Sequence, residues 1–175
     1  MKRISLLLVL FALPAAAAAV AALAASPQTA SQDNSWLTAA HQDNLAEIQS
    51  GNLAAEKGHT DAVRNAGRML SKDHAQLDAK LRPVAQQLGV ELPAEPNAEQ
   101  KQEAKAFKAL SGTQFDQTWT HDEADGHVKA IELTEREIQH GSSPQVKQLA
   151  QSALPVLKKH LHTLKQAADQ NNGDH

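Results

Sequence analysis

The sequence has no cysteine, no tyrosine and only 3% aromatic residues. Without cysteine, the chain cannot form disulfides, zinc fingers, iron–sulfur clusters or a thiol nucleophile. The scarcity of aromatic rings argues against a platform for single-stranded nucleic acid, because such platforms stack bases on aromatic side chains. No run of basic residues is longer than two, so the chain also lacks the stripe of positive charge that tracks a phosphate backbone. We therefore expect no nucleic-acid partner.

The first 25 residues are typical of a signal peptide. Lys2 and Arg3 precede an apolar run from Ile4 to Leu23, and small residues follow as far as Ser26 in an Ala-x-Ala pattern. We expect cleavage of residues 1–25, export to the periplasm or the outside, and no membrane span in the mature chain. The alternative is an uncleaved membrane anchor, because the apolar run is long enough for one.

The rest of the sequence is rich in alanine, leucine, glutamine and lysine, a composition typical of helices. We predict a polar linker over residues 26–34, one bundle domain over residues 35–170 and a disordered tail over residues 171–175. Glycine, proline and capping residues divide the domain into four long helices, with a short helix between the second and the third. Two hairpins joined by one long crossover predict an all-α, ferritin-like antiparallel four-helix bundle with a short extra helix in the crossover.

The second and the last of these helices each carry an apolar seam with one histidine in it. The seam residues recur in steps of four and three, which is the pattern of a helix packed against other helices. In the second helix they are Val63, Gly67, Leu70, His74, Leu77, Leu81, Val84 and Leu88, and in the last Val146, Ala150, Ala153, Leu157, His160, Leu164 and Ala167. A buried imidazole without a partner costs roughly 1–3 kcal/mol, so both histidines need one.

Each long helix places at least one ionisable residue on its apolar face near its midpoint. These residues are Glu47, His74, His127 and His160. Counted from the two hairpin turns, their depths within each hairpin differ by about one helical turn. We therefore predict one shared layer that binds a single transition metal, with Glu123 as an alternate ligand and Glu135 behind the ligands. Imidazoles with a carboxylate suit iron, zinc, manganese, copper or nickel rather than calcium or magnesium.

The same residues allow a second interpretation, in which the layer is a satisfied buried polar cluster that only fixes helix register. We interpret the other histidines as surface or structural residues, and Asp73 as exposed.

Five runs of sequence carry a family resemblance, and the segment with His127 and Glu135 matches more loosely. The runs are Trp36-Leu37-Thr38-Ala39-Ala40, Leu45-Ala46-Glu47-Ile48, Gly51-Asn52-Leu53-Ala54, Met69-Leu70-Ser71-Lys72-Asp73-His74 and Leu154-Pro155-Val156-Leu157-Lys158-Lys159-His160-Leu161. In their order and spacing they resemble the exported bacterial family called domain of unknown function 4142, over about residues 35–168. The resemblance implies a ferritin-like bundle whose role is mostly unassigned, with Glu47, His74, His127 and His160 as recurring polar positions.

The resemblance to di-iron ferritin-like enzymes is poorer. Those enzymes use a Glu-x-x-His motif on two of their helices, whereas Ser71 and Leu157 stand three residues before His74 and His160. The missing carboxylates argue against ferroxidase or oxygenase chemistry.

We interpret the chain as an exported, non-enzymatic bundle that holds one transition metal. One rival interpretation is a metal-dependent redox enzyme of stress defence. The other is an envelope interaction or structural protein whose polar layer only fixes helix register. The sequence leaves partners and the formation of a homo-oligomer open.

Overall fold

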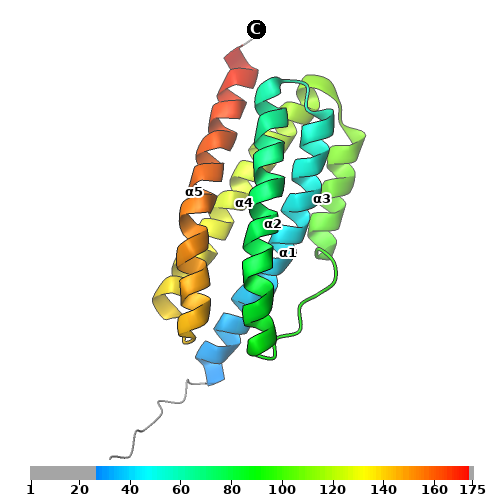
Figure 1. Ribbon diagram of the computed structural model, residues 1–175. Coiled ribbons are helices and arrows are strands. Elements are labelled where there is room, and N and C mark those ends of the chain that lie inside the picture. Colours follow the sequence, from blue (N-terminus) through cyan, green and yellow to red (C-terminus); the bar gives the residue numbers. More distant parts are fainter. Residues whose placement is uncertain (1–26, 174–175) are drawn as a thin grey trace, which may run out of the picture.

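The computed structural model describes residues 27–173, with side chains described for residues 31–170. This part of the chain consists of five helices and contains no strand (Figure 1). The helices are α1 (Pro27–Lys57), α2 (Asp61–Gln87), α3 (Ala98–Ala109), α4 (Gly112–His140) and α5 (Pro144–Gly173). The predicted all-α bundle, with four long helices and a short one in the crossover, is confirmed. The predicted signal peptide over residues 1–25 lies outside the described residues.

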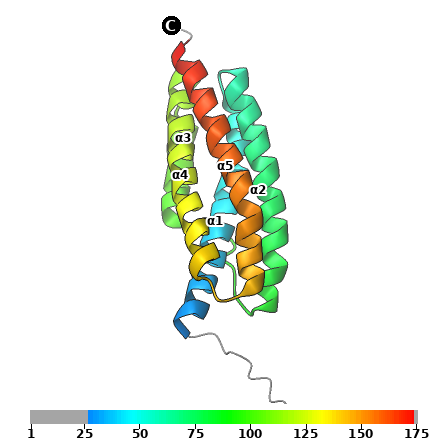
Figure 2. The same cartoon turned by 90° about the vertical axis from the view of Figure 1, so that its left-hand side faces the viewer.

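The four long helices form an antiparallel bundle, and α3 packs against one side of it. α1 and α2 form one hairpin, and α4 and α5 form the other; α2 packs against α5, whereas α1 packs more loosely against α4. Figure 1 shows the crossover from the end of α2 passing beside the bundle to α3, and Figure 2 shows the α4–α5 hairpin from the side. None of the helices in residues 27–173 is both long and apolar enough to cross a membrane.

Two glycines let α1 and α2 approach to backbone contact. A Cβ atom added to Gly67 would lie 2.5 Å from the carbonyl oxygen of Gly51, and one added to Gly51 would lie 2.6 Å from the carbonyl oxygen of Gly67. Both distances are far inside van der Waals contact, so a larger residue at either position forces the two helices apart.

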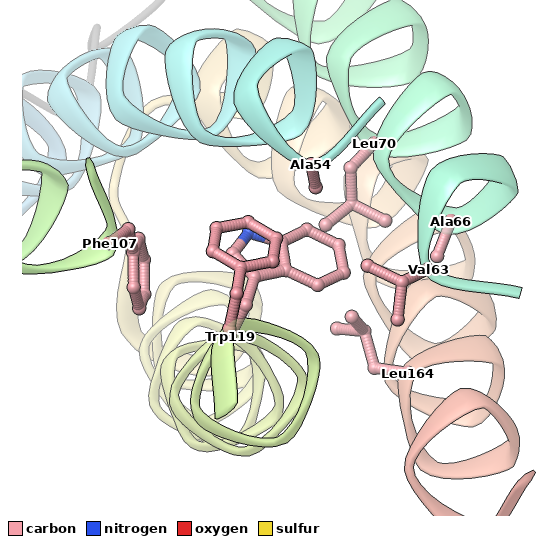
Figure 3. Close-up of a cluster of buried hydrophobic side chains, with 8 residues drawn as sticks. Ala54, Val63, Ala66, Leu70, Phe107, Trp119 and Leu164 are labelled. Carbon is pink, nitrogen blue, oxygen red and sulfur yellow. The ribbon is translucent and has the colours of Figure 1, made fainter. Parts of the chain in front are cut away.

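Two apolar clusters fill the two ends of the bundle. The cluster near the α1–α2 turn consists of Ala54, Val63, Ala66, Leu70, Phe107, Phe115, Trp119 and Leu164, and Figure 3 shows Trp119 pointing into its middle. The cluster near the other end consists of Leu37, Leu81, Ala85 and Val146. All residues of the predicted α5 seam are buried, and the α2 seam is buried or half-buried until Leu88, which is exposed. His74 and His160 therefore lie in their helices between two apolar regions.

α1 begins at Pro27 rather than near Ser35, so residues 27–34 are helical and the predicted linker is wrong there. A distant contact holds this segment in the fold. Asp33 is 3% exposed, and its carboxylate accepts hydrogen bonds of 2.9 Å from the backbone N–H groups of Ser142 and Ser143 in the α4–α5 turn. The predicted disordered tail is also wrong for residues 171–173, which continue α5; residues 174–175 lie outside the described part.

Asp116 of α4 makes the corresponding contact with the other hairpin. Its carboxylate accepts hydrogen bonds of 2.8 Å from the backbone N–H groups of His59 and Thr60 in the α1–α2 turn. Each hairpin thus places a buried aspartate, near the start of its first helix, against the turn of the other hairpin.

Replacing Gly67 by alanine should lower the free energy of unfolding by roughly 1–3 kcal/mol, because the backbones of α1 and α2 must separate. Gly126→Ala is the matched control. No atom lies within 4 Å of a Cβ built at Gly126, so this substitution should stabilise α4 by about 0.5–1 kcal/mol through helix propensity. Urea denaturation followed by circular dichroism measures both. Equal effects of the two substitutions would contradict the close approach at Gly67.

Glu137 is buried beside Asp33, and burial followed by the neighbouring carboxylate raises the pKa of Glu137 to about 7. The folded state therefore keeps a proton that the unfolded chain loses above pH 4.5, and this contribution to stability disappears as the pH rises through about 7. Glu137→Gln cannot ionise and should reduce the loss of stability between pH 5 and 8 by roughly 1–2 kcal/mol.

Urea denaturation at a series of pH values measures this difference. Glu135→Gln is the control, because Glu135 is half-buried and pairs with Lys158, and this variant should follow the unmodified protein. A Glu137→Gln variant with an unchanged pH dependence would show that Glu137 is ionised in the folded state.

Candidate metal centre

The imidazole rings of His74, His127 and His160 meet in the middle of the bundle. They come from α2, α4 and α5 and are 3%, 1% and 0% exposed. The ring centroids lie 5.6 Å apart for His74 and His127, 5.1 Å for His74 and His160, and 5.3 Å for His127 and His160. One nitrogen of each ring lies within 4.8 Å of a nitrogen of the other two. The structure thus brings together the three histidines that the sequence places at similar depth on separate helices.

In each of these rings, the nitrogen that points away from the other two rings donates a hydrogen bond. The pairs are His74 Nδ1 with Asn44 Oδ1 at 2.9 Å, His127 Nδ1 with the backbone oxygen of Glu123 at 2.8 Å, and His160 Nε2 with Asp73 Oδ2 at 3.2 Å. Amide, carbonyl and carboxylate oxygens accept, so these three nitrogens carry the hydrogen. In the neutral rings the remaining nitrogens are therefore acceptors.

Three acceptor nitrogens consequently face one another without a proton donor between them. His127 Nε2 lies 3.2 Å from His160 Nδ1, and His74 Nε2 is buried without a partner. Burial opposes protonation: it lowers the pKa of His127 to about 4 and holds those of His74 and His160 below their ordinary value. A metal cation between the rings would satisfy all three nitrogens.

This donor set fits a first-row transition metal, because neutral imidazole is a ligand for zinc, copper, iron and nickel. Zinc–nitrogen bonds of about 2.0–2.1 Å in a tetrahedral site separate two ligand nitrogens by roughly 3.3 Å, and His127 Nε2 and His160 Nδ1 are 3.2 Å apart. Metal-bound histidines almost always donate their other N–H to an oxygen that orients the ring, as all three rings do here. Three protein ligands leave a fourth coordination position open.

Glu47 and Glu123 form a carboxyl pair on the other side of His127. Glu47 Oε1 lies 3.6 Å from His127 Nδ1, the nitrogen turned away from the other two histidines. Glu123 accepts a hydrogen bond from the hydroxyl of Ser50, which accepts one of 2.8 Å from Trp119 Nε1. Burial raises the pKa of Glu123 to about 7, and burial followed by the Glu123 charge raises that of Glu47 well above its usual value.

The structure therefore groups Glu47 with Glu123 and His127, and not with all three histidines. The four predicted residues are close together, but the carboxylate and the three imidazoles do not converge on one point. Direct metal binding by Glu47 or by Glu123 stays a prediction.

A cavity of about 610 Å³ adjoins this site between α1 and α4, on the side that α3 covers. The loose packing of α1 against α4 leaves this space. His74 and His127 line the cavity, whereas His160 does not. A metal bound by the three histidines would therefore lie close to the cavity.

Glu135 belongs to neither group of side chains that could share a metal ion, and its role behind the ligands stays a prediction. Its carboxylate lies 2.8 Å from Lys158 Nζ in a half-exposed ion pair. Thr134, seven residues after His127, occupies the buried position of α4, because seven residues complete about two turns and the eight that lead to Glu135 overshoot them.

Asn44 and Asp73 belong to the site although the sequence analysis assigned them no role in it. Asn44 could have been found, because it lies on the same face of α1 as Glu47, three residues away. Asp73 was predicted to be exposed, but it is half-buried, and its carboxylate lies 3.2 Å from His160 Nε2 and 3.5 Å from Lys159 Nζ. The periodicity of α2 alone does not reveal that α5 covers the side of the helix on which Asp73 lies.

His41 has a structural role, in line with its interpretation. It is buried, its Nδ1 lies 2.6 Å from Asp78 Oδ1, and its Nε2 lies 2.9 Å from the carbonyl oxygen of Pro93. These contacts fasten the crossover to α1 and α2.

Fold and site together define an all-α helical bundle with a buried group of histidines and glutamates that could hold a metal. The chain belongs to the family described as a domain of unknown function (DUF4142), whose model matches residues 18–167. This match confirms the family that the sequence resembles. No curated protein and no solved structure matches the chain.

In the metal-free protein at pH 6, the rings of His74 and His127 should stay neutral, because burial lowers the pKa of His127 to about 4 and holds that of His74 well below its ordinary value. The unfolded chain takes up these protons below its ordinary histidine pKa of about 6.5, so this group loses stability as the pH falls. His121 is the control, because its exposed ring next to Asp122 has a raised pKa and should be protonated. Long-range proton–nitrogen NMR distinguishes neutral from protonated rings, and titration of His74 and His127 together with His121 would contradict the burial of the group.

Proposed function

We propose that this protein binds one transition-metal ion through His74 Nε2, His127 Nε2 and His160 Nδ1. The observation that carries the proposal is the meeting of three buried acceptor nitrogens whose rings are each oriented by an oxygen on the other side. A polar cluster that only fixes register pairs donors with acceptors internally, as His41 and Asp78 do. The three histidines instead bring three acceptor nitrogens together without a donor for them.

Iron, zinc, manganese and copper are the candidate metals, and three imidazoles favour zinc or copper among them. His74 and His127 would hold the metal at the wall of the cavity that Glu47 and Glu123 also line. A molecule that extended from the metal into the cavity would meet both carboxyl groups on its wall.

The proposal extends to the location of the protein. The signal-peptide pattern in residues 1–25 favours export, which would place metal binding in the periplasm or outside the cell.

Untagged protein should retain up to one transition-metal ion per chain, and His74→Ala should lose most of it, because two imidazoles bind metal far more weakly than three. Elemental analysis by mass spectrometry measures the content after purification and after reloading with zinc or copper. His121→Ala is the matched control, since His121 is exposed and belongs to neither group of side chains that could hold a metal.

Metal should also stabilise the unmodified protein and His121→Ala and so raise their melting temperatures. At a free metal concentration 100 times the dissociation constant, the free energy of unfolding should rise by about 2.7 kcal/mol. Equal metal content and equal stabilisation in His74→Ala would remove the proposal and leave a polar cluster that fixes helix register.

A further inference from the structure

The cavity between α1 and α4 is much larger than a metal ion requires. Its volume of about 610 Å³ lies within the roughly 300–1,000 Å³ that is usual for small-molecule sites. Of the three histidines, only His74 and His127 line the cavity, so a metal ion bound there would occupy a small part of it. The rest of the cavity is large enough for a small molecule.

The two ends of the cavity have different chemistry. α1 and α4 are antiparallel, because Gln32 contacts Glu137 and Ser50 contacts Glu123. The apolar end is lined by Trp36, Ala39, Ala40, Ala130, Leu133, Leu149 and Ala153, and the acidic end by Asp43, Glu47, Glu103 and Glu123. Trp36 and Glu47 are eleven residues apart on α1, which corresponds to about 16 Å of helix. An extended molecule with one apolar and one polar end matches this division.

The acidic end has few hydrogen-bond donors for its carboxyl groups, although Lys129 lines the cavity and acts electrostatically on Glu103. In the part of the chain whose side chains are described, no lysine or arginine forms an ion pair with any of its four carboxyl groups. Gln100 donates to Asp43 at 2.6 Å and Ser50 donates to Glu123, but no protein donor reaches Glu47 Oε2, which is buried. Burial also raises the pKa of Asp43 to about 6. A positively charged donor would give Glu47 Oε2 a partner and would stabilise the ionised form of Asp43. An anion would be repelled by both carboxyl groups.

We propose that the cavity binds an organic amine with an apolar body. Its ammonium group donates hydrogen bonds to Glu47 and Asp43, and its body lies against Trp36, Ala40 and Leu133. A primary ammonium has three donors and no acceptor, which is what the acidic end requires. An inorganic cation would satisfy the carboxylates but leave the apolar end empty, so the volume and lining favour the amine. The proposal goes beyond metal binding and does not depend on it.

Isothermal titration calorimetry of the full chain with three molecules of similar shape tests the head group. The probes are 3-phenylpropylamine, 3-phenylpropan-1-ol and 3-phenylpropanoate. The amine should bind at least tenfold more tightly than the alcohol, and the carboxylate should not bind measurably. 4-Phenylbutylamine should bind roughly fourfold more tightly than the shorter amine, because one more methylene group is buried.

Two substitutions test the two ends of the cavity. Glu47→Gln should weaken binding of the amine at least tenfold while leaving the alcohol unchanged, and Ala130→Phe should abolish binding of both by filling the apolar end. Glu56→Gln is the matched control, because Glu56 is exposed on α1 and does not line the cavity. If Glu47→Gln fails to fold by circular dichroism, Asp43→Asn replaces it, with the same expected loss.

His160→Ala separates this proposal from metal binding, because His160 is a metal ligand in the proposed function but does not line the cavity. Its affinity for the amine should stay within twofold of the unmodified protein even if no variant binds metal. Equal binding of amine, alcohol and carboxylate would overturn the proposal, as would unchanged amine binding in Glu47→Gln or its replacement. Displacement of the amine by zinc in His160→Ala would show that the carboxyl groups form an ion site instead.

Discussion

Three neutral imidazoles with acceptor nitrogens turned toward one another repel each other, and the rest of this structure keeps them in that arrangement. Asn44, the Glu123 carbonyl and Asp73 each fix one ring from outside the group. The two apolar clusters on either side hold the three helices that carry the rings. Because burial also excludes the protons that would relieve the repulsion, the arrangement has a free-energy cost that a bound cation would offset.

The fold and the depth of the histidines could be predicted from the sequence because both depend on periodicity. Steps of four and three place His74 and His160 on buried faces whatever the helices pack against, and both are buried. Capping residues and glycines likewise mark most helix ends to within a few residues. These are properties of single helices, and they are readable one helix at a time.

The features that the sequence did not reveal depend on contacts between helices. The helical segment around Asp33 looks like a polar linker until the α4–α5 turn supplies two N–H donors for its carboxylate. Asp73 looks exposed until α5 places His160 beside it. Glu47 lies at the predicted depth, but the direction of its carboxylate, toward Glu123 and not toward His160, depends on how far α1 is rotated against α4. Periodicity does not determine that rotation.

The cavity lies under α3, the short helix of the crossover. α1 and α4 pack loosely, and α3 covers the gap instead of closing it. Gly126, on the cavity wall, contacts nothing that would require a glycine, so the space is not the by-product of a close helix crossing. A short helix laid over a groove can admit a small molecule without disturbing the two tightly packed hairpins.

The reciprocal contacts of Asp33 and Asp116 relate the two halves of the chain to each other. Each aspartate is followed three residues later by a tryptophan, Trp36 or Trp119, so the hairpins share a pattern as well as a role. The backbone N–H groups of each turn donate to an aspartate of the other half, so these hydrogen bonds are lost when the halves separate. The bundle should therefore lose its structure as one cooperative unit, and the histidines that meet between the halves would disperse at the same moment.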